Sequence, residues 1–299
     1  MSSAYVATLV AAPQHATLSD AFLARAAQAL PGYVESRWLD KGVAADLIFT
    51  GDGDFEAIRE RLVEAAREIQ ADAILQPLAT RAKKLLIADM DSTLIGQECV
   101  DELAAAIGIG QHVAAITERA MRGEIEFESA LRERVGLLAE LPVAMIQRVL
   151  DARISLNPGA KTLVATMRAR GGYVAIVSGG FTPFTGEVAR RLGADEHRAN
   201  RLVIDGDKLS GEVIEPILGA NAKLEALRDL TQRFGLQRAE TLGVGDGAND
   251  LAMLLEAGLG VAYYAKPKVA AAAHARVDHA DLTALLYAQG ISRAEFVEG

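Results

Sequence analysis

The chain of 299 residues contains a single cysteine, Cys99. One cysteine excludes an intrachain disulfide and a cysteine-rich zinc site, and we interpret Cys99 as a small apolar residue rather than a nucleophile. The five histidines are scattered along the chain without the spacing of metal ligands. Metal sites built from thiolates or clustered imidazoles are therefore not expected.

Long apolar runs and net positive charge are also missing. Although 51% of the residues are hydrophobic, no uninterrupted apolar stretch reaches the ~18 residues of a membrane span. The apolar start, YVATLVAA, lacks a basic segment before it and predicts a strand rather than a signal peptide. The net charge of −9 argues against a broad nucleic-acid-binding surface. We therefore expect a cytoplasmic protein without membrane or nucleic-acid partners.

Residues 1–82 are predicted to form an α+β domain. Alternating and period-3.6 patterns predict strands near 4–10, 33–40, 43–51 and 71–78 and helices near 17–30 and 54–70. The order strand-helix-strand-strand-helix-strand is typical of a ferredoxin-like fold. Thr17 and Asp20 indicate a capping box at the start of the first helix.

Residues 83–299 show a different pattern, which predicts a second, α/β domain. Short apolar strands end in Gly, Ser or Asp, as in LLIAD, YVAIVSGG, ETLGVGDG and GLGVAYY, with helical segments between them. This pattern predicts a parallel sheet covered on both faces, whose ligands bind at the carboxyl ends of the strands. An almost wholly helical insertion at about 97–155 is expected to form a lid, and residues 201–213 predict a hairpin.

Two acids, Asp89 and Asp91, follow the first apolar strand of this second domain. Carboxylates so close together repel each other unless they are solvated or share a cation. The spacing does not fit a calcium loop of the EF-hand type, but a solvated loop or a helix cap remains an alternative. The chemical interpretation is a magnesium site at which one Asp attacks an electrophile and the other transfers a proton.

Three later segments carry further candidate groups, and each has an ordinary structural alternative. Ser178 and Gly179 offer a hydroxyl and a backbone N–H to a phosphate, or simply form a strand-to-helix turn. Lys223 lies at the start of a predicted helix, where lysines are usually solvated. The segment GDGAND partly matches a dinucleotide fingerprint, but Asp246 would place a carboxylate where the pyrophosphate should lie.

The four segments together resemble the haloacid dehalogenase (HAD) superfamily of phosphotransferases. The matching elements occur in the family's order: DMDST, VSGG, Lys223 and GDGAND. Longer stretches resemble the phosphoserine phosphatases of that superfamily: DMDSTLIGQECVDELA, LRERVGLL, VSGGFTPF, ANRLVIDGDKLSGEV and VGDGANDLAML. The resemblance covers nearly all of residues 83–290 and implies a Rossmann-like core with a helical cap. The amino-terminal domain resembles an ACT-type domain in its order of elements.

The resemblance implies roles for the acids. Asp89 would be the nucleophile that forms a phosphoaspartyl intermediate, and Asp91 would be the general acid and base. Mg²⁺ would be held by the Asp89 carboxylate, the Asp91 backbone carbonyl and Asp246, and Asp250 would support the metal through its waters.

The resemblance also implies which groups hold the phosphate. Ser178 and the Gly179 N–H would bind phosphoryl oxygens, Lys223 would add a fixed positive charge, and Asn249 would contact the phosphate.

Substrate choice is expected from the cap. The family pattern places the substrate ammonium at Glu98 and its carboxylate at Arg134, and an arginine can bind a carboxylate through two parallel hydrogen bonds. Phe127 lies seven residues before Arg134 and shares its helix face. Phe127 and Met121 match apolar positions that close over the site, with ordinary cap core as the alternative. Arg132 points about 200° away from Arg134 on the same helix.

The resemblance therefore implies Mg²⁺-dependent hydrolysis of O-phospho-L-serine, the last step of L-serine biosynthesis. Alternatives are phosphothreonine or another small phosphomonoester as substrate, and phosphoryl transfer to an acceptor alcohol. Further alternatives are an inactive ligand sensor, which the complete set of acids disfavours, and a dinucleotide-binding oxidoreductase, which Asp246 disfavours. A homodimer formed through the amino-terminal domain is a possible assembly.

Overall fold

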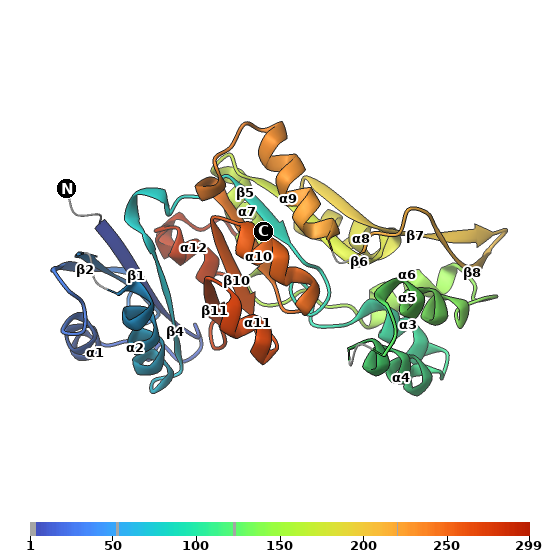
Figure 1. Cartoon of the computed structure of the whole chain (residues 1–299), viewed down its shortest axis with the longest axis horizontal. Coiled ribbons are helices and arrows are strands. Elements are labelled where there is room, and N and C mark those ends of the chain that lie inside the picture. Colours follow the sequence, from blue (N-terminus) through green and yellow to red (C-terminus); the bar gives the residue numbers. More distant parts are fainter. Residues whose placement is uncertain (1–3, 52–53, 122–123, 220) are drawn as a thin grey trace.

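The computed structural model describes residues 4–51, 54–121, 124–219 and 221–299, without the side chains of Ala120 and Met121. Two β-sheets form the framework of an elongated molecule (Figure 1). The amino-terminal unit lies at one end, the larger sheet lies in the middle, and a group of helices lies beside a long hairpin at the other end (Figure 1).

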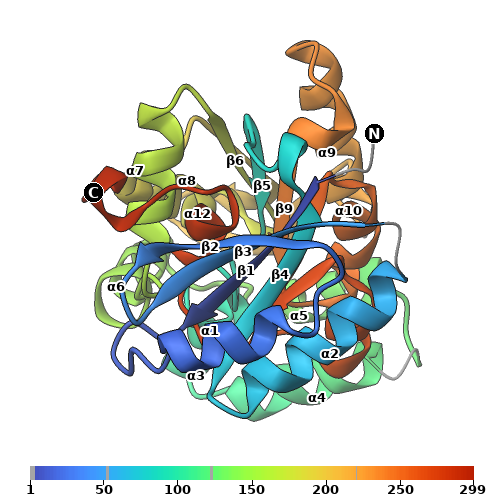
Figure 2. The same cartoon turned by 90° about the vertical axis from the view of Figure 1, so that its left-hand side faces the viewer.

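The amino-terminal sheet has the order β2-β3-β1-β4, and all its pairs are antiparallel. Its strands are β1 (Ala4–Ala11), β2 (Tyr33–Asp40), β3 (Ala44–Thr50) and β4 (Ala71–Pro77), and its helices are α1 (Asp20–Ala27) and α2 (Phe55–Arg67). The helices pack on one face through Phe22 and Leu62, which meet Leu47 of the sheet. The other face rests on the rest of the molecule (Figure 2). The ferredoxin-like order predicted from the sequence is confirmed.

The start of α1 differs from the prediction of a capping box made by Thr17 and Asp20. The capping residue is Ser19, whose hydroxyl accepts a hydrogen bond from the Phe22 N–H. Ser19 is extended at φ −132°, so its short side chain reaches back to the first turn, as is usual for a serine in this position. Asp20 is already helical, and its carboxylate binds Trp38 and Lys41 instead.

The larger sheet has the order β11-β10-β9-β5-β6-β7-β8. Its strands are β5 (Leu85–Ala88), β6 (Tyr173–Phe181), β7 (Glu196–Asp205), β8 (Lys208–Ile214), β9 (Thr241–Gly245), β10 (Leu259–Tyr263) and β11 (Ala275–Val277). All pairs are parallel except β7 with β8, which form the predicted hairpin. The short strand β11 was not predicted, because three residues carry too little pattern to be distinguished from a loop.

Helices cover both faces of this sheet, as a parallel sheet of apolar strands requires. They are α7 (Ala160–Ala169), α8 (Thr182–Leu192), α9 (Ala222–Arg233), α10 (Leu251–Glu256), α11 (Pro267–Ala272) and α12 (Ala284–Ala288). On one face Leu86 of β5 packs with α7, α8 and α12, and on the other Leu85 packs with α9, α10 and α11. Short 3₁₀ turns complete the chain at Leu78–Thr80, Arg238–Glu240, Ala248–Asp250 and Arg293–Glu295.

In the described part of the segment between β5 and α7, four helices form the predicted cap. They are α3 (Cys99–Ala106), α4 (Gly110–Met121), α5 (Phe127–Gly136) and α6 (Ala144–Ala152). The hairpin lies beside this cap (Figure 1), where Pro142 and Lys208 form a β-bridge and Arg132 of α5 pairs with Glu215. The α/β core with a helical cap inserted after its first strand is therefore confirmed.

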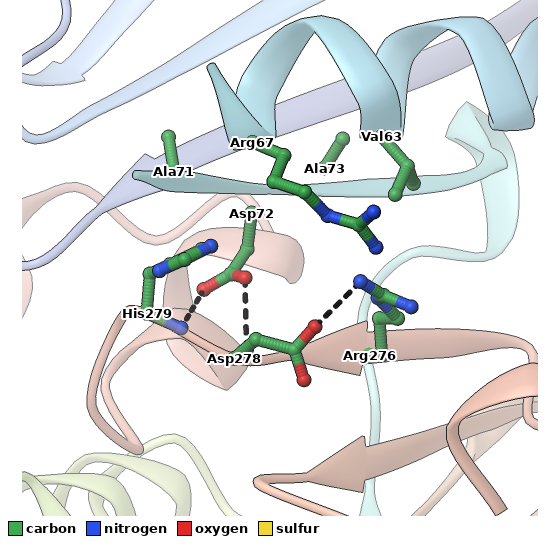
Figure 3. A pocket seen from close by; sticks show the side chains of 8 residues that line it. All are labelled: Val63, Arg67, Ala71, Asp72, Ala73, Arg276, Asp278 and His279. Atoms are coloured by element: carbon green, nitrogen blue, oxygen red, sulfur yellow. Dashed lines mark hydrogen bonds and ion pairs between the residues drawn. The ribbon is translucent and has the colours of Figure 1, made fainter. Parts of the chain in front are cut away.

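The amino-terminal unit joins the core through buried polar contacts. Asp72 of β4 accepts hydrogen bonds from three successive backbone N–H groups, those of Asp278, His279 and Ala280 (Figure 3 shows the first two). Arg81 forms a buried ion pair with Asp46, at 2.7 Å, and donates to backbone carbonyls at the end of α12. These contacts fix the two units against each other.

Within the described ranges, no helix combines the length and the apolar character that crossing a membrane requires.

Candidate active site

Acidic side chains surround Lys223 at the carboxyl edge of the larger sheet. Asp89 directly follows β5, and Asp250 lies in the turn that follows β9. The Lys223 Nζ, near the start of α9, lies 2.5 Å from Asp89 Oδ2 and 2.5 Å from Asp250 Oδ1. Lys223 is only 3% exposed, so it is not the solvated surface residue that its sequence position alone suggests.

Asp89, Asp246 and Asp250 form a candidate metal centre. One carboxylate oxygen from each of them lies within 4.8 Å of the others. Carboxylate oxygens are the ligands that hard divalent cations prefer. Both oxygens of Asp250 already accept hydrogen bonds, one from Lys223 and one from the Gly247 N–H. Asp89 is engaged in the same way, because its Oδ1 accepts from the Met90 N–H at 2.7 Å and its Oδ2 pairs with Lys223. Among these described acids, Asp246 has the least engaged side chain, with one long hydrogen bond of 3.4 Å from the Thr93 hydroxyl, and so has the most room to contact a cation directly.

The charges of this centre are not balanced by the protein alone. Burial and the neighbouring Asp250 raise the pKa of Asp89 well above its usual range, although Lys223 opposes the shift. Burial, followed by Asp250 and Glu98, raises the pKa of Asp246 to about 6. Burial lowers the pKa of Lys223, but Asp89 and Asp250 more than offset this and raise it. A divalent cation would relieve the crowding of negative charge.

Asp91 lies beside this centre and contacts the cap. Its Oδ1 accepts a hydrogen bond of 3.2 Å from the backbone N–H of Cys99, the first residue of α3. Burial and the nearby Glu98 raise the pKa of Asp91 to about 7. A carboxyl group that titrates near neutral pH can both give and take a proton.

Ser178 and Gly179 lie next to Asp91 at the end of β6. The strand continues through Phe181, so these residues do not form the strand-to-helix turn that was the ordinary structural alternative. The Ser178 hydroxyl accepts from the Gly180 N–H at 2.9 Å. A Cβ added at Gly180 would lie 3.2 Å from Asp91 Oδ2. The glycines therefore let this backbone approach the acids closely.

Asn249 lies on the loop between the two acids that follow β9. Its Oδ1 would be 2.4 Å from a Cβ added at Gly247, so the asparagine side chain folds over this glycine. Gly245 is equally constrained, because a Cβ there would lie 2.3 Å from the Asp250 carboxyl carbon. The two glycines of GDGAND, Gly245 and Gly247, thus leave room for the side chains of Asp250 and Asn249 to pack against the backbone.

The cap supplies Glu98 and Arg134 near these acids. Glu98 Oε1 accepts a hydrogen bond of 2.7 Å from the Ser92 hydroxyl, and its charge acts on both Asp91 and Asp246. Burial lowers the pKa of the Arg134 guanidinium, while the carboxylates of Asp101, Glu98 and Asp91 oppose that shift. Among the described residues, Arg134 donates hydrogen bonds only to the Thr117 hydroxyl and to the Ala130 carbonyl of its own helix, both at 3.4 Å. Its guanidinium is therefore available to a ligand.

Phe127 lies directly over the end of β6. Its Cζ is 3.3 Å from the position that a Cβ of Gly179 would occupy. Phe127 and Arg134 belong to the same helix, α5, whereas Arg132 of that helix points to Glu215 and the hairpin. The Met121 side chain lies outside the described part of the chain.

The family model described as haloacid dehalogenase-like hydrolase matches residues 86–255, more than half of the chain. The chain belongs to this family.

Individual relatives of this HAD hydrolase agree with the family match. A phosphoserine phosphatase of Archaeoglobus fulgidus is 42% identical over 222 residues, which are 74% of this chain and 64% of the relative. A phosphoserine phosphatase of Vibrio cholerae is 42% identical over 233 residues, 77% of this chain and 70% of the relative. A HAD hydrolase structure from Salmonella enterica serovar Typhi has a TM-score of 0.86 at 29% identity and covers 95% of this chain and 97% of its own. The chain thus spans slightly less than two thirds of the archaeal relative.

The dinucleotide alternative has no support in this HAD hydrolase. The Gly247 N–H, which a pyrophosphate would need, donates to Asp250 at 2.9 Å. A loop that binds its own carboxylate in this way repels a second anion at the same position.

Three residues near the acids were given no role from the sequence. The Thr93 hydroxyl donates to Asp246 at 3.4 Å, and Asn157 donates to the Thr93 carbonyl at 2.8 Å. Asn200 donates to the Gly179 carbonyl at 2.9 Å and accepts from the Leu218 N–H. Thr93 belongs to the DMDST motif, so its position in that motif could have indicated a role. Asn157 and Asn200 act by binding backbone groups, and such contacts produce no recognisable residue spacing in the sequence.

Proposed function

We propose that this HAD hydrolase converts O-phospho-L-serine and water into L-serine and phosphate through a phosphoaspartyl intermediate on Asp89. The observation that carries the proposal is the buried contact between Asp89 and Lys223, at the one edge of the sheet where Asp91, Asp246 and Asp250 also gather. A nucleophile held next to a fixed positive charge suits attack on a phosphate dianion.

In the first step, Asp89 attacks phosphorus while the bond from phosphorus to the serine oxygen breaks. Asp91, protonated near neutral pH, gives its proton to the departing serine oxygen. In the second step, the Asp91 carboxylate takes a proton from a water molecule that attacks the same phosphorus. This step releases phosphate and restores the Asp89 carboxylate, so that both acids return to their starting states.

Mg²⁺ is the proposed cofactor, held by the Asp89 carboxylate, the Asp91 backbone carbonyl and Asp246, with Asp250 behind them. The carboxylate donor set supports a hard cation. When bound, Mg²⁺ supplies positive charge that lets an anionic nucleophile approach an anionic phosphate.

Other groups of the same site would bind the phosphate. Ser178 and the Gly179 N–H would contact its oxygens, Lys223 would balance their charge, and Asn249 would close the loop over them. The close approach of the Ser178–Gly180 backbone to Asp91 supports this arrangement.

The cap would recognise the amino acid part of the substrate. Glu98 would bind its ammonium group and Arg134 its carboxylate, while Phe127 and Met121 would exclude water. The Arg134 guanidinium, which makes only two long hydrogen bonds with described residues, and the close approach of Phe127 to Gly179 support these roles.

The domain organisation is part of the same proposal. We assign residues 1–82 to an ACT-like domain and residues 83–299 to a phosphatase domain, with the cap at about 97–155. The names of the archaeal and Vibrio relatives support the substrate, and a place in L-serine biosynthesis would follow. A homodimer formed through the amino-terminal domain and a cytoplasmic location stay predictions.

The test is phosphate release from a panel of phosphomonoesters. Phosphoserine, phosphothreonine and p-nitrophenyl phosphate should be compared with Mg²⁺ present and with Mg²⁺ removed by EDTA. We expect phosphoserine to give the highest kcat/KM and EDTA to abolish turnover of all three. A clear preference for another ester would contradict the substrate, and full activity in EDTA would contradict the cofactor.

A further inference from the structure

The carboxyl end of β6 leaves the regular pairing of the larger sheet. The register between β6 and β7 shifts between Val177 and Phe181. Ser178–Gly180 of β6 lie in this interval, and only Ala199 lies opposite them on β7. We call Ser178–Gly180 the β6 bulge. Such irregularities are common next to active sites, where they turn particular groups toward a ligand.

The side chain of Asn200 binds the β6 bulge where the regular ladder is interrupted. Asn200 lies on β7 and is only 2% exposed. Its Nδ2 donates a hydrogen bond of 2.9 Å to the Gly179 carbonyl. A backbone group that leaves the ladder needs another partner, and the asparagine supplies it.

This hydrogen bond holds one end of a single peptide group. The Gly179 carbonyl and the Gly180 N–H belong to the same planar unit. Asn200 binds the carbonyl, and the Ser178 hydroxyl oxygen accepts from the N–H at 2.9 Å. Because glycine tolerates many backbone conformations, these two hydrogen bonds are the main obstacle to rotation of the Gly179–Gly180 peptide group.

The orientation of this peptide group decides how the Ser178 hydroxyl is used. A hydroxyl offers one donor and two acceptor positions, and the Gly180 N–H fills one acceptor position. The hydrogen of the Ser178 hydroxyl can therefore be directed to a ligand. If the peptide group turned over, the Gly179 carbonyl would face the hydroxyl and accept that hydrogen instead.

Asn200 is itself held in place by the segment before α9. Its Oδ1 accepts from the Leu218 N–H at 2.7 Å, and its Nδ2 also donates to the Leu218 carbonyl at 3.4 Å. The contact with an N–H on one side determines which end of the amide is oxygen. The Nδ2 of Asn200 is thus fixed in its direction toward the Gly179 carbonyl.

We propose that Asn200 is a positioning residue for the phosphate site. It keeps the Gly179–Gly180 peptide group in the orientation that leaves the Ser178 hydroxyl free to donate to a phosphoryl oxygen. This inference rests on the proposed function, in which Ser178 binds the phosphate. Asn200 does not touch the substrate, and its effect on phosphate binding passes through Ser178.

The experiment is calorimetric titration of the full chain with inorganic phosphate at neutral pH in the presence of Mg²⁺. Asn200→Ala should weaken phosphate binding about tenfold, the usual effect of losing a hydrogen bond to a charged group. Ser178→Ala should weaken it by a similar factor. Because Asn200 acts through Ser178, the double variant should bind phosphate about as well as Ser178→Ala alone.

Turnover provides a second readout. Asn200→Ala should lower kcat/KM for phosphoserine and for p-nitrophenyl phosphate by the same factor, because the two esters share the phosphoryl group. Loss of the fold alone would reduce the amount of active protein without changing the affinity of the folded fraction for phosphate.

Two further variants separate positioning from stability. Gln76→Ala also removes a buried amide that donates to a backbone carbonyl, that of Ala288 at 2.7 Å, but at the junction with the amino-terminal unit. It should lower the melting temperature and leave phosphate binding unchanged. Asn200→Asp keeps the size of the side chain and the acceptor for Leu218 but has no N–H for Gly179. It should lose phosphate affinity, and it replaces Asn200→Ala if that variant does not fold.

Three results would overturn the role of Asn200. They are unchanged phosphate binding in both Asn200 variants, an effect of Asn200→Ala that is equally large with and without Ser178→Ala, and an equal loss of phosphate affinity in Gln76→Ala. A preference for an ester other than phosphoserine would contradict the proposed substrate and leave the role of Asn200 standing. Absence of phosphate binding to the original chain would contradict both proposals.

Discussion

Lys223 and Asp250 form an ion pair that does not depend on the proposed nucleophile. The Lys223 Nζ lies 2.5 Å from Asp250 Oδ1, and both side chains are almost completely buried. When Asp89 carries a phosphoryl group, its own negative charge is no longer available to Lys223 in the same form. Asp250 then keeps the lysine in position. This arrangement separates the chemistry of Asp89 from the stability of the site.

Asp89→Asn is therefore expected to lose activity without losing the fold. The amide keeps the size of the carboxylate, and Lys223 keeps Asp250 as its partner. Phosphate release from phosphoserine should fall by at least about 10³-fold, as expected when a nucleophile is removed. The far-ultraviolet circular dichroism spectrum and the melting temperature should stay close to those of the original chain. Retention of more than a tenth of the activity would rule out Asp89 as the nucleophile.

Lys223→Met tests the charge balance of the centre. The change leaves Asp89 and Asp250 buried without their cation, and breaking a buried ion pair by removing one partner costs about 3–5 kcal/mol. Urea unfolding in EDTA should show this loss, and saturating Mg²⁺ should recover part of it because the cation binds the folded state.

Lys84→Met is the matched control for Lys223→Met. Lys84 pairs with Glu240, but its side chain is 64% exposed, and exposed pairs contribute about 1 kcal/mol or less. Equal effects of the two substitutions on the free energy of unfolding would contradict the proposed role of Lys223 in neutralising the acids.

Arg134→Ala tests substrate recognition, with Arg132→Ala as its control on the same helix. Arg134 lies in the field of the active-site acids, whereas Arg132 pairs with Glu215. Loss of a hydrogen-bonded ion pair with the substrate carboxylate should lower kcat/KM for phosphoserine by about 10- to 100-fold. Arg132→Ala should change it little. Because p-nitrophenyl phosphate has no carboxylate, its kcat/KM should survive Arg134→Ala, and an equal loss on both esters would refute recognition by Arg134.

The sequence predicted the architecture well because its patterns are local. The strand around Leu85 and Leu86 is apolar on both faces and short, which in a chain with intervening helices indicates a covered parallel sheet. The helices of the cap and the turn of the hairpin are likewise predicted by patterns among residues that are close together in the sequence. The short strand β11 and the role of Ser19 as the N-terminal capping residue of helix α1 were not predicted, because each depends on one or two contacts rather than on a repeated pattern.

Only part of the site could be predicted from the sequence, and the reason is physical. The acids and Lys223 stand at strand and helix ends, where topology brings distant segments together. Asn200 and Asn157 work by holding backbone carbonyls at 2.9 and 2.8 Å, and such contacts leave no spacing in the chain.

The metal-free protein is expected to lose stability as the pH rises through the range in which its crowded acids ionise. Burial and nearby carboxylates raise the pKa of Asp246 to about 6 and that of Asp91 to about 7 in the folded state, whereas an unfolded Asp titrates near about 4. The folded state thus holds these protons more tightly. The resulting stabilisation is complete below about pH 4 and disappears as the pH passes through about 6 to 7.

Asp246→Asn isolates one of these contributions, because the amide cannot ionise. We expect the variant to gain stability relative to the original chain between pH 4 and pH 8 in EDTA, by on the order of 1 kcal/mol. Urea unfolding at several pH values measures the difference, and Asp207→Asn on the exposed hairpin should show no such trend. Saturating Mg²⁺ should reverse the order at pH 8, since the original chain then gains the free energy of binding. A difference that is independent of both pH and Mg²⁺ would mean that Asp246 neither carries the raised pKa nor contacts the cation.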